Sequence, residues 1–125
     1  MRKGRVLIVD DEREYALALA ERLGLRGYET KVLFCSDDLL REIAREAYDI
    51  ILLDLLLEGE SGMDLLRKTT GCSAGCCVIV MTGVADERVC RAAAAEGAVD
   101  LLVKPVDINV LIERIELALR GHSNA

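Results

Sequence analysis

The sequence predicts an α/β protein of one domain, built as a doubly wound sheet of five parallel strands. A length of 125 residues leaves little room for a second domain. Four short apolar runs lack alternating polar residues, which is typical of strands buried on both faces of a parallel sheet. Between them lie segments with apolar residues at helical spacing. This alternation of strands and helices predicts a parallel sheet covered by helices on both faces.

Five segments are predicted to be strands. The apolar runs are VLIV (6–9), IILL (50–53), CVIVM (77–81) and VDLLV (99–103). The remaining run, ETKVLF (29–34), is more polar than the others. Because a strand at the edge of a sheet is less completely buried than a central one, we expect this run to lie at an edge.

Five segments are predicted to be helices, and in most of them the apolar residues fall on one face. They span residues 12–25, 37–47, 62–70, 86–96 and 107–120. Ser36 or Asp37 is expected to cap the second helix. The fourth is rich in alanine and ends before Gly97. Residues 1–121 form the predicted domain, and 122–125 are expected to be a frayed tail.

Composition narrows the possible functions. The net charge of −6 argues against direct binding of nucleic acid. No apolar run is long enough to cross a bilayer, so no membrane association is expected. The start, MRKGRVLIVDDE, lacks the longer apolar region and the cleavage site of a secretory signal. We therefore expect a cytoplasmic protein.

The cysteines are expected to be free thiols. Their number is odd and no secretory signal is seen, so a disulfide framework is not expected. The run CSAGCC (72–77) lacks a second Cys or His pair, because the only histidine is His122, and this argues against a zinc site. Cys77 is expected to be buried in a strand as a small apolar residue. The five cysteines are Cys35, Cys72, Cys76, Cys77 and Cys90.

Polar residues close four of the predicted strands. In parallel sheets the carboxyl ends of neighbouring strands meet at one edge, and ligands bind there. Asp54 is therefore expected at the lip of the sheet rather than inside the core. The residues that close the strands are Asp10, Asp11 and Glu12, then Asp54, then Thr82 and Gly83, and finally Lys104 and Pro105.

Carboxylates gathered at one edge need positive charge, because two of them about 4 Å apart repel by about 4 kcal/mol at an effective dielectric constant of about 20. Lys104 supplies one positive charge, and a hard divalent cation would balance the rest. Mg²⁺ is expected, because it binds few carboxylates and shares its ligand sphere with phosphate oxygens. Beside these charges Asp54 can attack a phosphoryl group to form an aspartyl phosphate. The Thr82 hydroxyl can donate to a phosphoryl oxygen.

Four stretches carry a resemblance to a known family. VLIVDDE, IILLDLLLEGESGMDLL, VIVMTG and GAVDLLVKPV are similar to the receiver domain of bacterial two-component response regulators, in the chemotaxis-regulator-like superfamily. The resemblance covers nearly the whole chain. It implies a flavodoxin-like sheet with strand order 2-1-3-4-5, which agrees with an edge position for residues 29–34.

The resemblance assigns the phosphoacceptor and the metal ligands. Asp54 would be the residue that is phosphorylated. Asp11 would bind Mg²⁺ directly and Asp10 largely through water. Asp54 and the backbone carbonyl of Leu56 would complete the protein ligands.

The resemblance also implies a switch. Thr82 would bind the phosphoryl group and change conformation, and Lys104 would pair with a phosphoryl oxygen. Pro105 would follow a cis peptide bond. Leu101 stands where the family usually has an aromatic switch residue, so either switching uses a leucine or the chain is a receiver that no longer switches and acts as a docking module.

Partners follow from the same resemblance. A sensor histidine kinase or a phosphotransfer protein would supply the phosphoryl group and meet the first helix, where Tyr15 and Leu19 lie. The face of residues 86–96, 99–103 and 107–120 would repack and bind a partner or a second copy. An output domain or downstream protein is not in this chain. The charged residues of this face would either form ion pairs across a dimer or be a solvated face of mixed charge. They are Arg88, Arg91, Asp100, Asp107 and Glu113.

The sequence departs from the usual pattern of the family in two further places. Glu58 stands where a proline is common, which predicts a more mobile and acidic loop. Leu56 and Val84 stand where family side chains influence the attack of water on the phosphoryl group. Neither can orient a water molecule, so a long-lived phosphoryl group is expected.

Each site residue also has an ordinary interpretation. Asp10 with Asp11 can cap a helix, and Asp54 a loop. Thr82 can begin a turn, and Lys104 can be a solvated strand end before a proline that enters a helix.

Two other classes of protein fit the sequence less well. A small Mg²⁺-dependent phosphohydrolase would need a second acid at position 56, which is a leucine. A flavin mononucleotide carrier would need a phosphate loop rich in Ser, Thr or Gly after the first strand and aromatic residues to stack on the flavin, but the segment DDERE is acidic and aromatic residues are only 3%. The chain is therefore not expected to be an enzyme, beyond phosphorylating itself and slowly losing the phosphoryl group.

Overall fold

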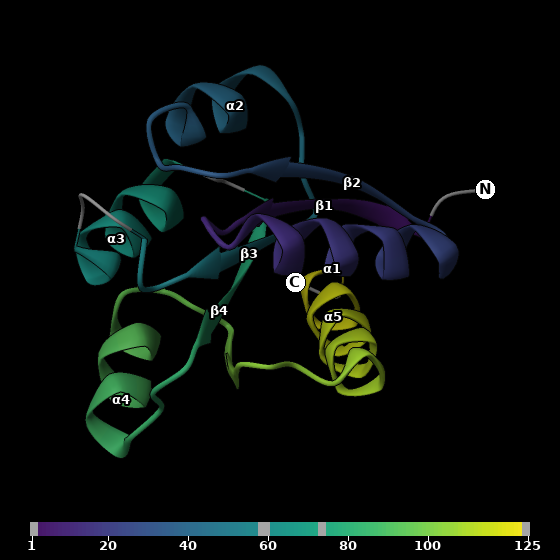
Figure 1. The fold of residues 1–125 in the computed structure, drawn as a ribbon. Coiled ribbons are helices and arrows are strands. Elements are labelled where there is room, and N and C mark those ends of the chain that lie inside the picture. Colours follow the sequence, from purple (N-terminus) through teal and green to yellow (C-terminus); the bar gives the residue numbers. More distant parts are fainter. Residues whose placement is uncertain (1–2, 58–60, 73–74, 124–125) are drawn as a thin grey trace.

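Five parallel strands form the centre of the molecule (Figure 1). The computed structural model describes residues 3–57, 61–72 and 75–123. The strand order is β2-β1-β3-β4-β5, as predicted, with the polar strand β2 at an edge. The strands are β1 (Gly4–Val9), β2 (Tyr28–Leu33), β3 (Ile50–Asp54), β4 (Cys77–Thr82) and β5 (Asp100–Val103).

Helices cover both faces of this sheet, with α1 and α5 on one side and α2, α3 and α4 on the other (Figure 1). The helices are α1 (Arg13–Leu25), α2 (Leu39–Arg45), α3 (Gly62–Cys72), α4 (Glu87–Ala95) and α5 (Ile108–Ser123). The last helix runs past its predicted end at residue 120, and residues 124–125 of the expected tail lie outside the described residues. Across the described part of the chain, the helices are all too short or too polar to cross a membrane.

The continuous apolar runs are explained by burial on both faces. Successive side chains of a strand point to opposite faces, so Val6 and Ile8 pack against α1 and α5, whereas Leu7 and Val9 pack under α2, α3 and α4. Strands β3 and β4 divide their side chains in the same way. Each fully buried aliphatic side chain contributes roughly 1.5–3 kcal/mol relative to an exposed one. This burial fixes the register that aligns the strand ends.

The expected cap of the second helix is wrong. The backbone N–H of Leu39 donates to the carbonyl of Ser36 at 3.1 Å, so residues 36–39 form a turn that ends at Leu39, the first residue of α2. The N-cap residue is Asp38, whose side chain makes no capping hydrogen bond. By contrast, α4 ends before Gly97 as predicted, because Gly97 adopts a φ of 102° that favours glycine.

The cysteines follow the prediction as far as the structure describes them. Cys77 is buried at the start of β4. Cys35 and Cys90 are exposed and Cys76 is half-buried, and all of these described thiols are free. Burial raises the pKa of the Cys76 thiol to about 12. The side chain of Cys72 lies outside the described residues.

A buried carboxylate on α2 ties the helix to the sheet. Glu42 accepts hydrogen bonds from Arg45 at 2.6 Å, from the Tyr48 hydroxyl, and from Lys31 at 3.0 Å on β2. The hydrogen bonds from Arg45 and Tyr48 lower the pKa of Glu42 to about 2, against the opposing effect of its burial. The group therefore stays ionised in the folded protein at neutral pH.

Replacing this carboxylate should flatten the acid side of the stability curve. The lowered pKa means that Glu42 stabilises the fold above its unfolded pKa of about 4.3, and that this contribution is lost as pH falls towards 2. Glu42→Gln should lower the free energy of unfolding by about 1–3 kcal/mol at neutral pH and by less at about pH 3. Urea titrations at both pH values test this, with Glu21→Gln on the exposed face of α1 as the control. Parallel curves for wild type and Glu42→Gln would contradict it.

The start of α3 lies directly against the end of β3. A Cβ atom at Gly62 would lie 2.0 Å from the carbonyl oxygen of Leu55, the residue that follows Asp54. Only glycine allows this approach, which ties the first turn of α3 to the strand end.

A methyl group at this position should therefore destabilise the protein. Gly62→Ala should cost about 1–3 kcal/mol, as overpacking does elsewhere. Gly71→Ala lies in the same helix, and its Cβ would meet no atom within 4 Å. That control should stabilise the protein by about 1 kcal/mol, because alanine favours the helix. Urea denaturation measures both changes, and equal effects would show that the contact with Leu55 is unimportant.

Candidate functional site

Two carboxylates from neighbouring strands meet at the carboxyl edge of the sheet. Asp10 directly follows β1 and Asp54 ends β3, and these strands are adjacent in the sheet. Both residues are buried, with exposed fractions of 0% and 2%. Asp54 thus lies at the end of its strand, as expected, but its side chain is shielded from water.

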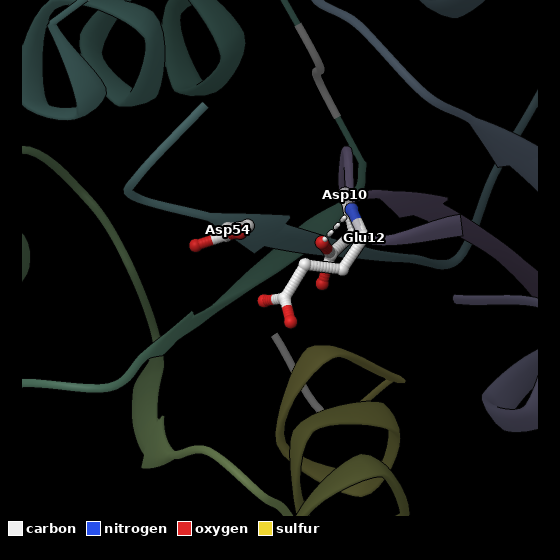
Figure 2. A group of neighbouring side chains, drawn as sticks. All are labelled: Asp10, Glu12 and Asp54. Carbon is white, nitrogen blue, oxygen red and sulfur yellow. Dashed lines mark hydrogen bonds between the residues drawn. The ribbon is translucent and has the colours of Figure 1, made fainter. Parts of the chain in front are cut away.

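Backbone N–H groups orient the two carboxylates. The N–H of Glu12 donates to Asp10 Oδ1 at 2.9 Å, and Figure 2 marks this bond. The N–H of Leu56 donates to Asp54 Oδ1, also at 2.9 Å. Each aspartate therefore has one oxygen held by the loop that follows its strand. The other oxygen of each faces the ammonium group of Lys104.

Lys104 is the positive charge of this site. Its Nζ lies 2.9 Å from Asp10 Oδ2 and 3.3 Å from Asp54 Oδ2, and it also donates to the Glu12 carboxylate. Burial by itself would lower the pKa of Lys104, but the hydrogen bonds to Glu12 and Asp10 and the charges of Asp10 and Asp54 raise it overall. The ammonium therefore stays charged and holds these acids together.

Burial and hydrogen bonding have opposite effects on the pKa of Asp10. Burial raises the pKa of this carboxyl above its ordinary value, and the hydrogen bonds from the Glu12 N–H and Lys104 offset only part of that rise. A buried carboxylate with one cationic partner is in an environment that a second positive charge would stabilise.

The carboxylates can supply oxygen ligands to a hard cation. One oxygen from each of Asp10, Glu12 and Asp54 lies within 4.8 Å of the others, and Figure 2 shows these side chains around the strand ends. Carboxylate oxygens are the donors that Mg²⁺ and Ca²⁺ prefer. The donor set therefore fits such an ion. Asp11, which the resemblance assigns as a direct ligand, lines the same cavity, but its carboxylate is not in this closest group.

The cavity beside these residues has a volume of about 290 Å³. It combines carboxylates, one ammonium group and apolar side chains at the carboxyl edge of the sheet, and Asp54 forms part of its wall. Its lining consists of Asp11, Glu12, Tyr15, Asp54, Leu56, Gly83, Lys104 and Pro105. The peptide bond between Lys104 and Pro105 is cis, as the resemblance implied.

Thr82 reaches the site edge but bonds elsewhere. It ends β4 and is buried, and its hydroxyl donates to the carbonyl of Val84 at 3.1 Å and accepts from the Val84 N–H at 3.2 Å. In this structure the side chain closes a turn over Gly83, which is the ordinary role considered for it. Donation to a phosphoryl oxygen would require the hydroxyl to give up its bond to the Val84 carbonyl.

Leu101 lies away from the carboxylates. It is half-buried on β5 and lines a separate cavity between α4 and β5, together with Cys90 and small alanine side chains. Leu19 is buried in the core, as expected. The loop position Glu58 lies outside the described residues.

Sequence reasoning assigned no role to Glu12 and did not place Tyr15 at the site. The Tyr15 hydroxyl accepts a hydrogen bond from the Val106 N–H at 3.1 Å, and Lys104 Nζ lies 4.7 Å from the centre of its ring. The spacing could have indicated both residues. Glu12 is the third acid of the run that closes β1, and Tyr15 follows it by one helical turn on the same side.

The charged face of α4, β5 and α5 is already partly paired within one chain. Arg91 pairs with Glu87, and Asp100 pairs with Arg114 at 2.8 Å. Asp107 accepts from the N–H of Asn109 at 2.8 Å at the start of α5. Ion pairs across a dimer that used Arg91 or Asp100 would therefore exchange these partners.

The family model of the response regulator receiver domain matches residues 6–116. The uncharacterized transcriptional regulatory protein YkoG of Bacillus subtilis is 34% identical over 121 residues, covering 96% of this chain and 53% of that protein. The chain spans about half the length of the curated relatives it matches.

Solved structures give the same fold. A CheY-like response regulator receiver domain protein from Methanospirillum hungatei superposes with a TM-score of 0.90 at 28% identity, covering 96% of each chain. A response regulator from Burkholderia pseudomallei superposes with a TM-score of 0.85 at 25% identity, covering 98% of this chain and 72% of that one. The crystal structure of that protein contains a phosphorylated aspartic acid, a calcium ion and citrate.

Proposed function

The chain belongs to the response regulator receiver family, and on this premise we propose that it accepts a phosphoryl group on Asp54 in a Mg²⁺-dependent reaction. The donor would be a sensor histidine kinase or a phosphotransfer protein. One observation carries the proposal: Asp54 ends β3 as a buried carboxylate with Lys104 Nζ at 3.3 Å and a second buried acid, Asp10, on the same ammonium.

The chemistry follows from this arrangement. An oxygen of Asp54 attacks the phosphorus atom, and the bond between phosphorus and the leaving group of the donor breaks. The N–H of Leu56 orients the carboxylate through Oδ1, which leaves Oδ2 on the side of Lys104. Lys104 can then move its hydrogen bond from a carboxylate to a phosphoryl oxygen, and Thr82 can donate to another.

The residues at this edge fit a divalent cation. When bound, Mg²⁺ would neutralise negative charge on the carboxylates and the phosphoryl oxygens. We propose that Asp11, Asp54 and the carbonyl of Leu56 hold it directly and that Asp10 does so largely through water. The related Burkholderia protein, with its phosphorylated aspartic acid and calcium ion, supports this pairing of an aspartyl phosphate with a divalent ion.

The output would act through the face of α4, β5 and α5. We propose that Thr82 leaves its turn with Val84 on phosphorylation, that Leu101 and the loop at Pro105 adjust, and that the face of α4, β5 and α5 then binds a partner or a second copy. Receiver domains are signalling domains, so turnover of a free substrate is not expected. The family match leaves the phosphohydrolase and the flavin carrier without support.

The phosphoacceptor is tested by intact mass. After incubation with acetyl phosphate and Mg²⁺, the wild type should gain one phosphoryl group and Asp54→Ala none, because the attacking carboxylate is gone. Asp64→Ala, an exposed aspartate in the first turn of α3, is the matched control and should still be modified. A folded wild type that gains no mass would instead favour the non-switching docking module.

The phosphoryl group, once formed, should persist for minutes rather than seconds. Leu56 lines the cavity and is 65% exposed, and Val84 is 61% exposed beyond Gly83, so the side chains at these positions offer no group that orients water. Leu56→Gln should shorten the lifetime several-fold by supplying an amide. Leu17→Gln changes an exposed leucine on α1 and should not alter it. Loss of inorganic phosphate from purified phosphoprotein measures the lifetime, and decay of the wild type within seconds would refute the expectation.

A further inference from the structure

Glu12 occupies the N-cap position of α1 but does not cap the helix. Its side chain makes no hydrogen bond to the N–H groups of the first turn. Instead, its carboxylate bonds to Lys104 Nζ, ninety-two residues further along the chain. N-cap side chains usually accept hydrogen bonds from the N–H groups of the first helical turn. The bond from Lys104 to Glu12 is therefore not explained by stabilisation of α1.

The partners of Lys104 differ in how easily they can leave it. Asp10 and Asp54 are buried, and each is held by a backbone N–H through its other oxygen. The Glu12 side chain is 62% exposed, whereas that of Lys104 is 10% exposed. An exposed ion pair contributes little and is readily replaced by water, but a buried carboxylate without its cation is costly. Glu12 is therefore the partner that Lys104 can exchange.

We propose that Glu12 is a positioning residue that occupies Lys104 until a phosphoryl oxygen replaces it. This rests on the proposed phosphorylation of Asp54. The acids Asp10, Glu12 and Asp54 share one ammonium group, so an incoming phosphoryl group must displace one of them to reach Lys104. Glu12 also adds negative charge at the cavity through which the anionic donor enters. For both reasons it slows phosphorylation by small anionic donors.

The surroundings of Lys104 limit where its ammonium can go. The Tyr15 ring lies one helical turn beyond Glu12 on α1 and contacts Nζ at 4.7 Å from the ring centre. Loss of the Glu12 carboxylate therefore leaves Lys104 between Tyr15 and the two buried aspartates. From there it can meet a phosphoryl group on Asp54 without first breaking an additional ion pair.

Rates of phosphorylation test the proposal. Glu12→Gln should react with acetyl phosphate at saturating Mg²⁺ about two- to fivefold faster than the wild type, the range that an exposed ion pair allows. Glu14→Gln removes the same charge from the exposed first turn of α1 and should react at the wild-type rate. Intact mass against time gives the rates, and circular dichroism checks that both variants fold.

A second readout needs neither metal nor phosphorylation. In metal-free protein labelled with ¹⁵N-lysine, the Nζ resonance of Lys104, assigned with Lys104→Arg, should shift in Glu12→Gln and exchange its protons with water faster. In Glu14→Gln it should be unchanged. A role of Glu12 in helix stability alone would move the thermal midpoint but not this resonance.

The outcomes separate this inference from the proposed function. Equal or slower phosphorylation of Glu12→Gln, or an equal acceleration by Glu14→Gln, would overturn the role of Glu12 and leave the phosphoacceptor intact. An unchanged Lys104 resonance in Glu12→Gln would overturn the contact itself. If the wild type gains no phosphoryl group, the proposed function fails, and the proposed exchange of Glu12 for a phosphoryl oxygen on Lys104 fails with it.

Discussion

One ammonium group shared by three carboxylates organises the functional edge of this molecule. Lys104 comes from the end of β5, and its partners Asp10, Glu12 and Asp54 come from the ends of β1 and β3. Without the lysine, two buried acids would face each other in a poorly solvated site, where their repulsion is strong. The ion pairs therefore connect strands that are not neighbours, and they keep the carboxylates close enough to bind a divalent cation.

The sheet supplies the precision that this interaction requires. Asp54 lies opposite Met81 and Thr82 lies opposite Val103, so neighbouring strands end within one or two residues of each other. That register is held by apolar side chains on both faces, because a shift by one residue would turn every buried side chain to the other face. The close contact between Gly62 and Leu55 holds the segment after Asp54 against α3.

The same geometry suggests how a local charge can be transmitted. The Thr82 hydroxyl is hydrogen-bonded to Val84, and the Lys104 ammonium is hydrogen-bonded to carboxylates. Both groups therefore have partners before any phosphoryl group is present. A phosphoryl group would draw both groups to new partners. Tyr15 contacts Lys104 and also accepts from the backbone of Val106, which joins α1 to the segment between β5 and α5. With Leu101 in place of an aromatic residue, Tyr15 is the ring that contacts both the site lysine and the segment leading into α5.

The sequence by itself determined the α/β class, the strand order implied by its family resemblance, and the polar residues that close the strands. These are local properties, because burial on both faces leaves continuous apolar runs and each strand end is marked by a polar residue. Only the tertiary structure decided which of those residues touch. Glu12 and Asp10 lie far from Lys104 in the chain, and the folded geometry decided between the two roles that the sequence allowed for Thr82, because its hydroxyl bonds to Val84. The cap of α2 was missed for a similar reason, since a turn at Ser36 moved the helix start. Contacts across strands and choices between hydrogen-bond partners depend on the folded geometry, whereas burial pattern and strand ends are written along the chain.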